Sequence, residues 1–330
     1  MTADDDGTSL SRACALIEKW SSISPRHCLD IRSPEDYAKA HLIPSTNIPF
    51  PSLESSFSQL PPKFSGTSFL LITPPHTYFR GLPIGGLLSL RGWRLDGVIE
   101  VPTDDSANSI WSHVEKLQIL GTGEEGTELM FRPSPVLGEW IDFIEQSLLL
   151  KQTLTMVDIG CGSGRDMGFL ISRPRGWHVI GLDSWQKSLV RAQSLVKSIN
   201  PSPHLSTFLH AEILDDGTIL PLSPSQLVKD VDLVVISRFF RRELFRRLHE
   251  YIARGGFLVF SHFTEGLGPG GKEYETPPRE KRVRRGEVEE ILGGIEGWEV
   301  LQAKDASSED GRPMWDVVAR WSGKSFLETD

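Results

Sequence analysis

Cysteine is scarce in this chain, which has 330 residues and three cysteines, Cys14, Cys28 and Cys161. These are too few and too scattered for a disulfide framework or a zinc site. Long apolar runs are also missing, since none approaches the roughly 18 residues of a membrane span. The opening MTADDDGTSL is acidic and polar, unlike a secretory or mitochondrial leader. We therefore expect a protein of a reducing compartment, the cytoplasm, with the nucleus as the alternative.

An excess of positive charge is absent as well. The chain has 35 Lys and Arg residues against 44 Asp and Glu residues, which gives a formal net charge of -9. This balance argues against general electrostatic attraction to nucleic acid or to an anionic membrane, although it leaves room for a local basic patch. The length exceeds that of most single domains, so two domains are expected.

The first third of the chain alternates helical patterns with short apolar strands, which predicts a parallel sheet. Helical patterns are expected at 9–20, 33–42 and 81–93. Strands are expected at 27–33, 68–73 and 96–101. The segment 1–9 is expected to be a disordered tip, and the polar, glycine-rich segment 103–128 is expected to be a linker.

A second alternation follows the expected linker. Helices are expected at 134–150, 184–199 and 242–253, with one more after the glycines near residue 160. Strands are expected at 154–160, 177–183, 205–213, 231–237 and 256–263. The segment 265–285 is rich in proline, glycine and charge and predicts a long loop. Two further strands and a helix close the sequence.

The stretch TMVDIGCGSGRDMGFL, residues 155–170, carries the clearest chemical signal. An apolar strand runs into Asp158, and glycines follow at every second position, Gly160, Gly162 and Gly164. Glycine permits tight dihedrals and lets a ligand approach the backbone amides. In open α/β sheets, such a turn at the carboxyl end of a strand is where ligands bind.

The spacing excludes the commonest nucleotide motifs. A G-x-G-x-x-G dinucleotide motif fails because Arg165 stands at its third position, and no Gly-Lys-Ser/Thr is present for a phosphate-binding loop. Asp158 would repel a pyrophosphate but would suit a ligand that carries an ammonium group. Asp183 ends the next strand and is placed to accept hydrogen bonds from a ribose diol. The alternative is a glycine turn of purely structural use.

Asp-x-Gly-x-Gly-x-Gly followed by a strand-terminal acid resembles the fingerprint of class I S-adenosylmethionine (SAM) methyltransferases. The resemblance implies SAM as cofactor and a Rossmann-like seven-stranded sheet. It implies a set of cofactor-binding positions, which are Asp158, Gly160, Cys161, Gly162, Gly164, Asp183, Ser184, Glu212, Ile213 and Ser237. Glu212 falls where a carboxylate commonly reads the adenine amino group. Cys161 is interpreted as a small buried spacer rather than a nucleophile.

The segment VDLVVISRFFRRELFRRLHEYIARGGFLVFSHFTEG is similar to the fourth and fifth strands of tellurite-resistance-type and thiol methyltransferases. The similarity runs from about Leu129 to Trp321, and Gly-Arg-Asp at 164–166 matches the same families. It implies a small-molecule acceptor of thiol or metalloid type, with Arg238 favouring an anionic acceptor. His262 is the candidate general base for a nitrogen or oxygen acceptor, and a structural hydrogen bond is its alternative role.

The front of the chain resembles a rhodanese domain over about residues 10–102. CLDIRSPEDYAKAHLIPSTNIP contains the matching positions, which are Asp30, Arg32, Tyr37, His41, Ile43, Pro44 and Asn47. Ser45 and Thr46 stand where that family prefers Gly-Ala. A rhodanese requires a cysteine thiolate after its fourth strand, and Pro74 occupies that place. The resemblance therefore implies an inactive domain that packs or docks a protein partner.

The overall prediction is an α/β protein, with a rhodanese-like parallel-sheet domain at 10–102 and a Rossmann-like methyltransferase domain at 129–323. Two alternative functions remain. Arg241, Arg242, Arg246 and Arg247 cluster as an RNA methyltransferase requires, although charge runs are usually solvated faces. A non-catalytic SAM-binding or scaffold protein is the alternative from another class. No metal is expected.

Overall fold

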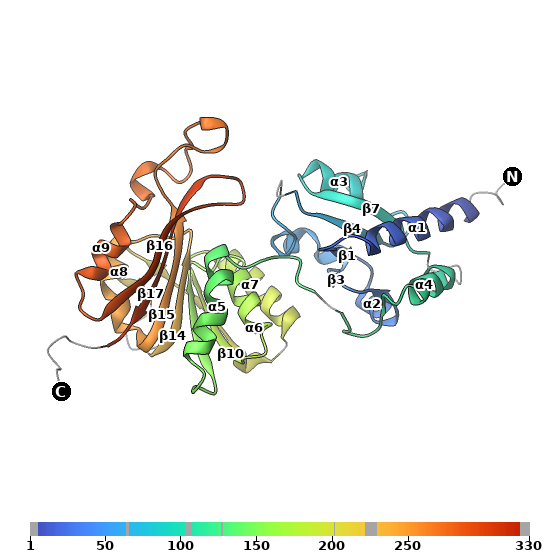
Figure 1. Cartoon of the computed structure of the whole chain (residues 1–330). Helices are drawn as coiled ribbons and strands as arrows, with labels where there is room; N and C mark the ends of the chain where they lie inside the picture. The colour runs from blue at the N-terminus through green and yellow to red at the C-terminus, as the bar shows by residue number, and fades with distance from the viewer. Residues whose placement is uncertain are drawn as a thin grey trace. The chain divides into compact units, whose positions relative to one another are not determined.

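A computed structural model describes residues 6–63, 66–102, 107–126, 128–200, 202–221 and 230–323. The chain divides into two compact units, which meet in sequence between Phe131 and Arg132 and are called unit 1 and unit 2 below (Figure 1). Helix α1 spans Asp6–Ser21. It begins inside the segment 1–9 that was predicted to be disordered, so that prediction is wrong from Asp6 onward; residues 1–5 lie outside the described part.

Unit 1 is built on a four-stranded parallel sheet of order β3-β1-β4-β7. Its strands are β1 Cys28–Asp30, β3 Thr46–Asn47, β4 Ser68–Thr73 and β7 Arg94–Glu100. The buried strand β4 alternates its side chains between two apolar clusters, because successive residues of a strand point to opposite faces. Leu70 and Ile72 join the cluster of α1, and Phe69 and Leu71 join that of α3, Ile84–Leu90.

Two further predictions for unit 1 have clear outcomes. Helix α2, Pro34–Lys39, lies within the helix predicted over 33–42 and begins after Ser33, whose hydroxyl accepts a hydrogen bond from the amide of Asp36. The linker prediction over 103–128 is wrong for its described residues, because α4, Ala107–Lys116, buries Ile110 and Val114 in unit 1. In addition, β8, Leu120–Gly121, pairs with β2, His41–Leu42. Residues 103–106 and 127 lie outside the described part.

Unit 2 contains the predicted seven-stranded sheet, in the order β11-β10-β9-β14-β15-β17-β16. The strands are β9 Leu154–Ile159, β10 Trp177–Asp183, β11 Ser206–His210, β14 Val231–Ser237, β15 Ile252–Phe263, β16 Trp298–Ser307 and β17 Pro313–Trp321. The first five pair in parallel, and β17 is antiparallel to both of its neighbours. The sheet therefore brings the carboxyl ends of β9, β14 and β15 to one edge.

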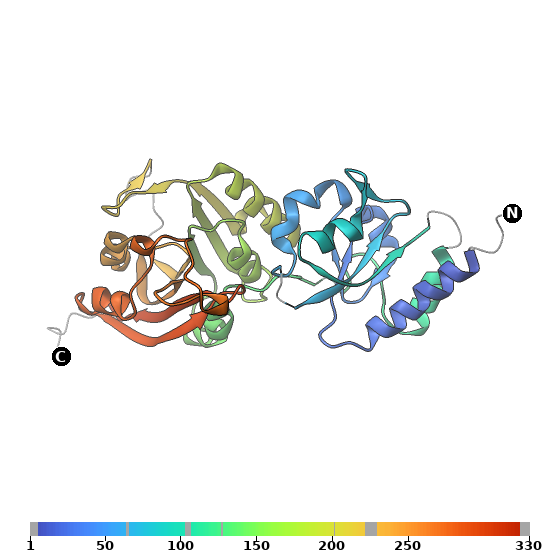
Figure 2. The ribbon, with the colours of Figure 1, turned by 90° about the horizontal axis from the view of Figure 1, so that it is seen from above.

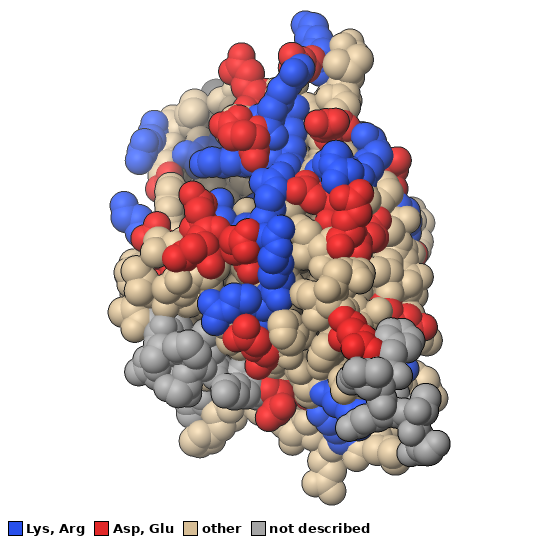
Figure 3. All heavy atoms as spheres, turned by 90° about the vertical axis from the view of Figure 1, so that its left-hand side faces the viewer, with Lys and Arg blue, Asp and Glu red and all other residues tan. Residues whose placement is uncertain are grey.

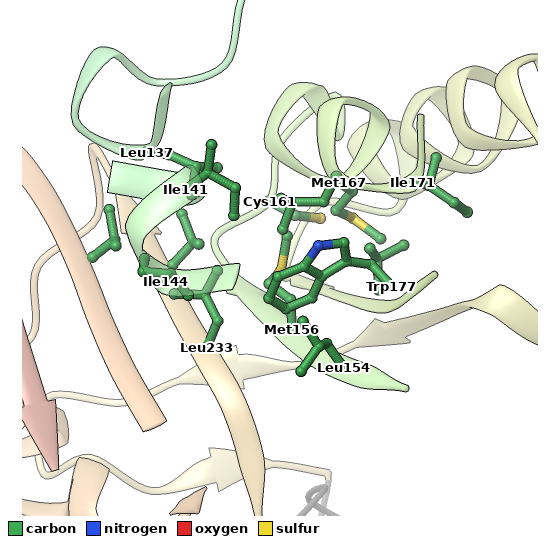
Figure 4. Packing of buried hydrophobic residues seen from close by; sticks show 14 of the residues in the cluster. Leu137, Ile141, Ile144, Leu154, Met156, Cys161, Met167, Ile171, Trp177 and Leu233 are labelled. Carbon is green, nitrogen blue, oxygen red and sulfur yellow. The ribbon is translucent and has the colours of Figure 1, made fainter. Parts of the chain in front are cut away.

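Helices cover both faces of this sheet (Figure 2). One face carries α5 Pro135–Ser147, α6 Arg165–Ile171 and α7 Gln186–Ile199. Figure 4 shows Leu137, Ile141 and Ile144 of α5 beside Met156 of β9 and Leu233 of β14. The other face carries α8 Arg242–Arg247 and α9 Glu287–Gly293. Of the helices that the structure describes, none combines the length and apolar character needed to cross a membrane.

Some predicted boundaries in unit 2 are corrected. The helix predicted over 242–253 ends at Arg247, because a 3-10 turn over Leu248–Glu250 leads straight into β15. The strand predicted over 205–213 ends at His210. Glu212–Ile213 form β12, which pairs in an antiparallel hairpin with β13, Ile219–Leu220. The loop 265–285 contains two short 3-10 turns. It is held by the buried Arg282, whose guanidinium lies 3.8 Å from the ring centroid of Tyr274.

Candidate functional site

A cavity of about 310 Å³ opens at the carboxyl edge of the unit 2 sheet. Four segments line it: the glycine turn after β9, the end of β14, the residues before α5, and the β16–β17 hairpin with the adjacent part of β15. Six predicted site residues are among the lining residues, which are Asp158, Gly160, Cys161, Gly162, Ser237 and Arg238. The segment before α5 contributes Arg132, Pro133 and Ser134, and the hairpin contributes Ser308, Glu309 and Asp316.

Two glycines of the turn, Gly162 and Gly164, are needed for different structural reasons. Gly162 has φ 55° and faces open space, since an added Cβ would meet no heavy atom within 4 Å. Gly164 has φ 77°, and a Cβ there would lie 2.8 Å from the Cβ of Ala192 in α7. Gly162 therefore leaves room on the cavity side, whereas Gly164 permits α6 and α7 to approach. Gly164 does not line the cavity, which differs from its predicted role in cofactor contact.

Asp158 is a buried acid that lines the cavity and is 3% exposed. Burial raises the pKa of its carboxyl well above the ordinary value, and the nearby acids Asp166 and Asp183 add to the effect. Among the described residues, no donor of a hydrogen bond to this carboxylate is found. A buried carboxylate without a donor favours a cationic, hydrogen-bonding ligand, because such a ligand offsets the cost of removing the charge from water.

Asp183 shapes the glycine turn rather than the cavity wall. Its Oδ2 accepts a hydrogen bond from the amide of Gly162 at 2.9 Å, and its Oδ1 accepts one from the amide of Trp185 at 2.8 Å. A carboxylate has about four acceptor sites, so capacity for further donors remains. Contact between Asp183 and a ribose stays a prediction.

Three positions predicted to bind the cofactor lie elsewhere. Ser184 is exposed, and its carbonyl accepts a hydrogen bond from Nε2 of His210 at 2.9 Å. Glu212 is exposed on the β12–β13 hairpin, and Ile213 is buried in the apolar cluster of α8 and α9. None of the three lines the described cavity. Contact of these three residues with the cofactor stays a prediction.

The hairpin between β16 and β17 supplies an acid that the sequence did not reveal. Glu309 forms ion pairs with Arg238 and, at 3.8 Å, with Arg165. Burial tends to raise the pKa of Glu309, but the two guanidinium groups prevail and hold it below the ordinary value. Arg238 and Arg165 thus share one carboxylate, and a role of Arg238 toward an anionic acceptor stays a prediction.

Asp166 links the glycine turn to the segment before α5. Its Oδ1 accepts a hydrogen bond from the amide of Ser134 at 2.6 Å. Burial raises the pKa of Asp166, while Ser134 and the two nearby arginines, Arg165 and Arg238, oppose that rise. Asp166 therefore binds a segment 32 residues earlier in the chain and does not pair on the surface of its own helix.

His262 does not belong to the cavity, so its prediction as a general base there is wrong. It follows Ser261 in β15 and points to the opposite face of the sheet, as strand alternation requires. Its Nε2 donates a hydrogen bond to the carbonyl of Lys281 at 2.8 Å, and rings of Phe240, Phe260 and Phe263 surround it. Burial lowers the pKa of His262 to about 4. The alternative of a structural hydrogen bond describes what this residue does.

Cys161 is a packing residue, as the sequence interpretation held. Its side chain is buried, and burial raises the pKa of its thiol far above the ordinary value. A Cβ added at Gly181 of β10 would lie 2.9 Å from its Sγ. The thiol thus fills the space that Gly181 leaves, and it stays protonated.

Ser261 and Asp316 form a polar pair that the sequence analysis missed. The Oγ of Ser261 donates a hydrogen bond to Oδ1 of Asp316 at 2.6 Å. Both side chains are almost fully buried, and both residues line the cavity. The one available signal was the acid that begins DVVARW, a strand segment whose other residues are apolar except for Arg320.

The arginines of α8 and the segment before it are paired with carboxylates. Arg241 lies 3.2 Å from Asp215, and Arg247 lies 3.2 Å from Glu250. Arg242 pairs with Glu287, and Arg246 pairs with Glu243. Figure 3 shows this side of the molecule, where a line of basic side chains runs between groups of acidic ones. Within the described residues, no group of three or more His, Cys, Asp or Glu side chains is arranged to hold a metal ion.

In unit 1, the residues of the rhodanese-like motif make structural contacts. Arg32 binds the carboxylate of Asp30 through Nε and Nη2, at 3.0 Å and 2.6 Å, and both side chains are buried. His41 stacks on Tyr37 with the ring centroids 3.9 Å apart. The carbonyl of Pro74, at the place of the expected nucleophile, accepts a hydrogen bond from Oγ1 of Thr77 at 2.7 Å.

Comparison with known proteins identifies relatives of the chain and of its fold. No family model matches the chain. A Schizosaccharomyces pombe protein described as uncharacterized protein UNK4.09 is 26% identical over 329 residues, covering 89% of this chain and 93% of that protein.

Solved structures are similar to just over half of the chain. A putative sarcosine dimethylglycine methyltransferase from Galdieria sulphuraria has a TM-score of 0.44 and 12% identity, with 57% of this chain and 85% of that one covered. Magnesium protoporphyrin IX methyltransferase from Synechocystis, solved with bound SAM, has a TM-score of 0.39 and 16% identity, with 56% and 79% covered. The cyclase SpnF has a TM-score of 0.41 and 15% identity, with 56% and 80% covered.

Proposed function

We propose that unit 2 is a SAM-dependent methyltransferase that acts on a small-molecule acceptor. The observation that carries the proposal is Asp158, a buried carboxylate in the cavity wall beside the open face of Gly162. The order of the seven strands supports it. Strands β9 and β14 are neighbours, but the chain continues from β9 to β10 on one side of this pair and from β14 to β15 on the other side. Such a switch in strand order is where ligands bind in open α/β sheets.

The residues present fit SAM. The Asp158 carboxylate would hold its ammonium group, and Gly162 would leave space for the ligand against the backbone. Asp183 fixes the Gly162 amide and thereby the shape of the turn. When bound, SAM supplies an electrophilic methyl group on a positively charged sulfur. The protein's part is to hold methyl group and acceptor in line and to exclude water, which lowers the entropic cost of the transfer.

The cavity volume and the pairing of the surface arginines favour a small-molecule acceptor over RNA. The cavity of about 310 Å³ lies at the lower end of the range for small-molecule sites. The four arginines proposed to bind RNA each face a carboxylate, so their net attraction for phosphate is weak.

For unit 1, we propose a rhodanese-like module that docks a protein partner and does not transfer sulfur. Support comes from Cys28, which is buried in β1 and whose thiol pKa is raised well above the ordinary value by burial and by Asp30. Cys14 is half-buried on α1, and burial together with Glu18 raises the pKa of its thiol. Neither thiol has the lowered pKa that a reactive nucleophile needs.

Calorimetric titration with SAM tests the proposal, with Asp158→Asn as the key variant. We expect the wild type to bind and the variant to bind roughly 10- to 100-fold more weakly, since a hydrogen bond to a charged group contributes about 1.5–3 kcal/mol. The raised pKa of Asp158 means that folding disfavours its ionised form. The variant should therefore have the larger free energy of unfolding at pH 7, which excludes misfolding as the cause of weak binding.

The matched control is Asp142→Asn, which removes a carboxylate of α5 whose side chain is 85% exposed. Its dissociation constant for SAM should stay within twofold of the wild-type value. A folded wild-type protein that fails to bind SAM would sink the enzyme proposal and favour the scaffold alternative.

A further inference from the structure

We propose that Asp316, held by Ser261, accepts a proton from the methyl acceptor, and that the acceptor reacts through an uncharged nitrogen that carries hydrogen, as in an arylamine or a ring N–H. This inference rests on the proposed function and deepens it.

Strand register places Asp316 across the cavity from the glycine turn. Ser237 of β14 pairs with Ser261 of β15, and Ser261 pairs with Asp316 of β17. Neighbouring strands lie about 4.8 Å apart, so this row extends roughly 10 Å from β14. Asp158 lies on the other side of β14, in β9. An acceptor between the two acids would be flanked by the SAM end of the cavity and by Asp316.

The wall at the Asp316 end of the cavity has hydroxyl groups and an acid, whereas Arg132 belongs to the segment before α5. Ser237, Ser261, Ser307 and Ser308 line it together with Met314. Arg165 and Arg238 share Glu309. A thiolate, a carboxylate or a phosphate placed against this wall would lie beside the Asp316 carboxylate, which repels an anion. The wall suits a neutral acceptor that donates a hydrogen bond.

The charged groups nearest to Asp316 come from the elements packed around it. Lys304 of β16 pairs with Asp316 across the strands, and its Nζ binds Glu139 of α5 at 2.6 Å and 2.9 Å. Burial raises the pKa of Asp316; Ser261 and Lys304 oppose the rise, and Glu139 adds to it. The ionised carboxylate is therefore a stronger proton acceptor than an exposed aspartate.

The chemistry of the transfer selects the acceptor. The nitrogen lone pair forms a bond to the methyl carbon, the carbon–sulfur bond breaks, and its electron pair stays on sulfur as a neutral thioether. The nitrogen becomes cationic and its N–H becomes acidic, so a carboxylate suffices to take the proton, leaving an N-methyl product and a protonated Asp316. An alcohol would need a stronger base, and a thiol is already ionised to about a few per cent at pH 7 without one.

The test uses full-length protein, SAM carrying a ¹³C-labelled methyl group, and a panel of small arylamines, ring N–H compounds, alcohols and thiols as acceptors. The ¹³C chemical shift of the product methyl distinguishes N-methyl from O-methyl and S-methyl. We expect an N-methyl product whose rate rises with pH as the Asp316 carboxyl ionises. Asp316→Asn should lower the rate about 100-fold or more and abolish that pH dependence, because general base catalysis contributes about 10²–10⁴-fold.

Calorimetry with SAM separates the possible failures. Asp316→Asn should bind SAM within twofold of wild type, and so should the control Asp305→Asn, an exposed acid of β16, which should also keep full activity. An S-methyl or O-methyl product, or an Asp316→Asn rate equal to wild type, would overturn this inference and leave SAM binding intact. A wild type that binds SAM but methylates nothing overturns both the transfer and this inference, and one that does not bind SAM removes the proposed function itself.

Discussion

The imidazole of His262 is an uncharged group in an apolar environment, and this state has a consequence for stability. Its pKa is about 4 in the folded protein, against an ordinary value of 6.5. The unfolded chain therefore binds a proton more readily than the folded one. The resulting contribution to stability is fully present above pH 6.5 and is lost as the pH falls through about 4. The difference between the two values corresponds to about 3 kcal/mol.

We expect urea denaturation to show this loss. Between pH 7.5 and pH 4.5 the wild type should lose about 2–3 kcal/mol more of its unfolding free energy than His262→Gln does, since the variant has no imidazole to protonate. His204→Gln, which removes an exposed imidazole, should follow the wild type. Equal losses in wild type and His262→Gln would mean that His262 is charged or accessible in the folded protein.

Local spacing decided which site residues were predictable from the sequence. Asp158 and its glycines lie within seven positions of one another. The sequence alone therefore predicts the turn and a ligand that carries an ammonium group. Asp316 and Ser261 are 55 residues apart, and Arg238 and Glu309 are 71 apart. Each pair exists because strand register or a hairpin brings its members together, and register is set by packing across the sheet. His262 was misjudged for a related reason, since a strand end alone does not reveal which face a side chain takes.

At the scale of elements, the glycine turn has two roles: Gly162 leaves space on the cavity side, and Gly164 permits α6 and α7 to pack closely. Substitution of each glycine should separate the two roles. Gly162→Ala and Gly164→Ala both place a Cβ on a residue with positive φ, which costs about 1 kcal/mol or more. Gly164→Ala also meets Ala192 of α7, and such overpacking adds about 1–3 kcal/mol. Gly162→Ala adds a methyl group on the open, cavity side instead.

Thermal unfolding and SAM titration should therefore rank the two variants in opposite orders. Gly164→Ala should be the less stable protein, and Gly162→Ala should have the larger loss of SAM affinity per unit of stability lost. Ser163→Ala, between them, is the control for a side-chain change without a change of backbone preference. If both glycine variants lost affinity in proportion to stability, Gly162 would have no role of its own in ligand contact.

Element prediction succeeded where apolar residues are dense and failed where they are sparse. The buried strands β4, β9, β10 and β14 were all found, because parallel strands covered on both faces are continuous apolar runs. Helix α4 stands where the sequence predicts a linker, because its buried side chains are Ile110 and Val114, one turn apart, among mostly polar residues. The helix predicted over 242–253 ends early because Ile252 and Ala253 are already part of β15. Periodicity alone does not distinguish a last helical turn from the start of a buried strand.

In the whole molecule, each apolar cluster consists of residues from a single unit. The clusters around β4 belong to unit 1, and those around the seven-stranded sheet belong to unit 2. Each unit thus has the core that independent folding requires. Leu71 of β4 and Leu233 of β14 are fully buried members of the two units. They provide a matched pair of sites for the same Leu→Ala change.

We expect each variant to lower the unfolding free energy of its own unit by about 2–5 kcal/mol, the usual cost of such a cavity. Leu71→Ala should leave the dissociation constant for SAM within twofold of wild type, since the proposed site is built entirely from unit 2. Leu233→Ala should weaken SAM binding, because Leu233 pairs with Met156 two residues before Asp158. Chemical denaturation should show one early transition in each variant, and calorimetry reports SAM affinity. A loss of affinity in Leu71→Ala as large as in Leu233→Ala would show that unit 1 is required for the site, and the independence of the two cores would not extend to function.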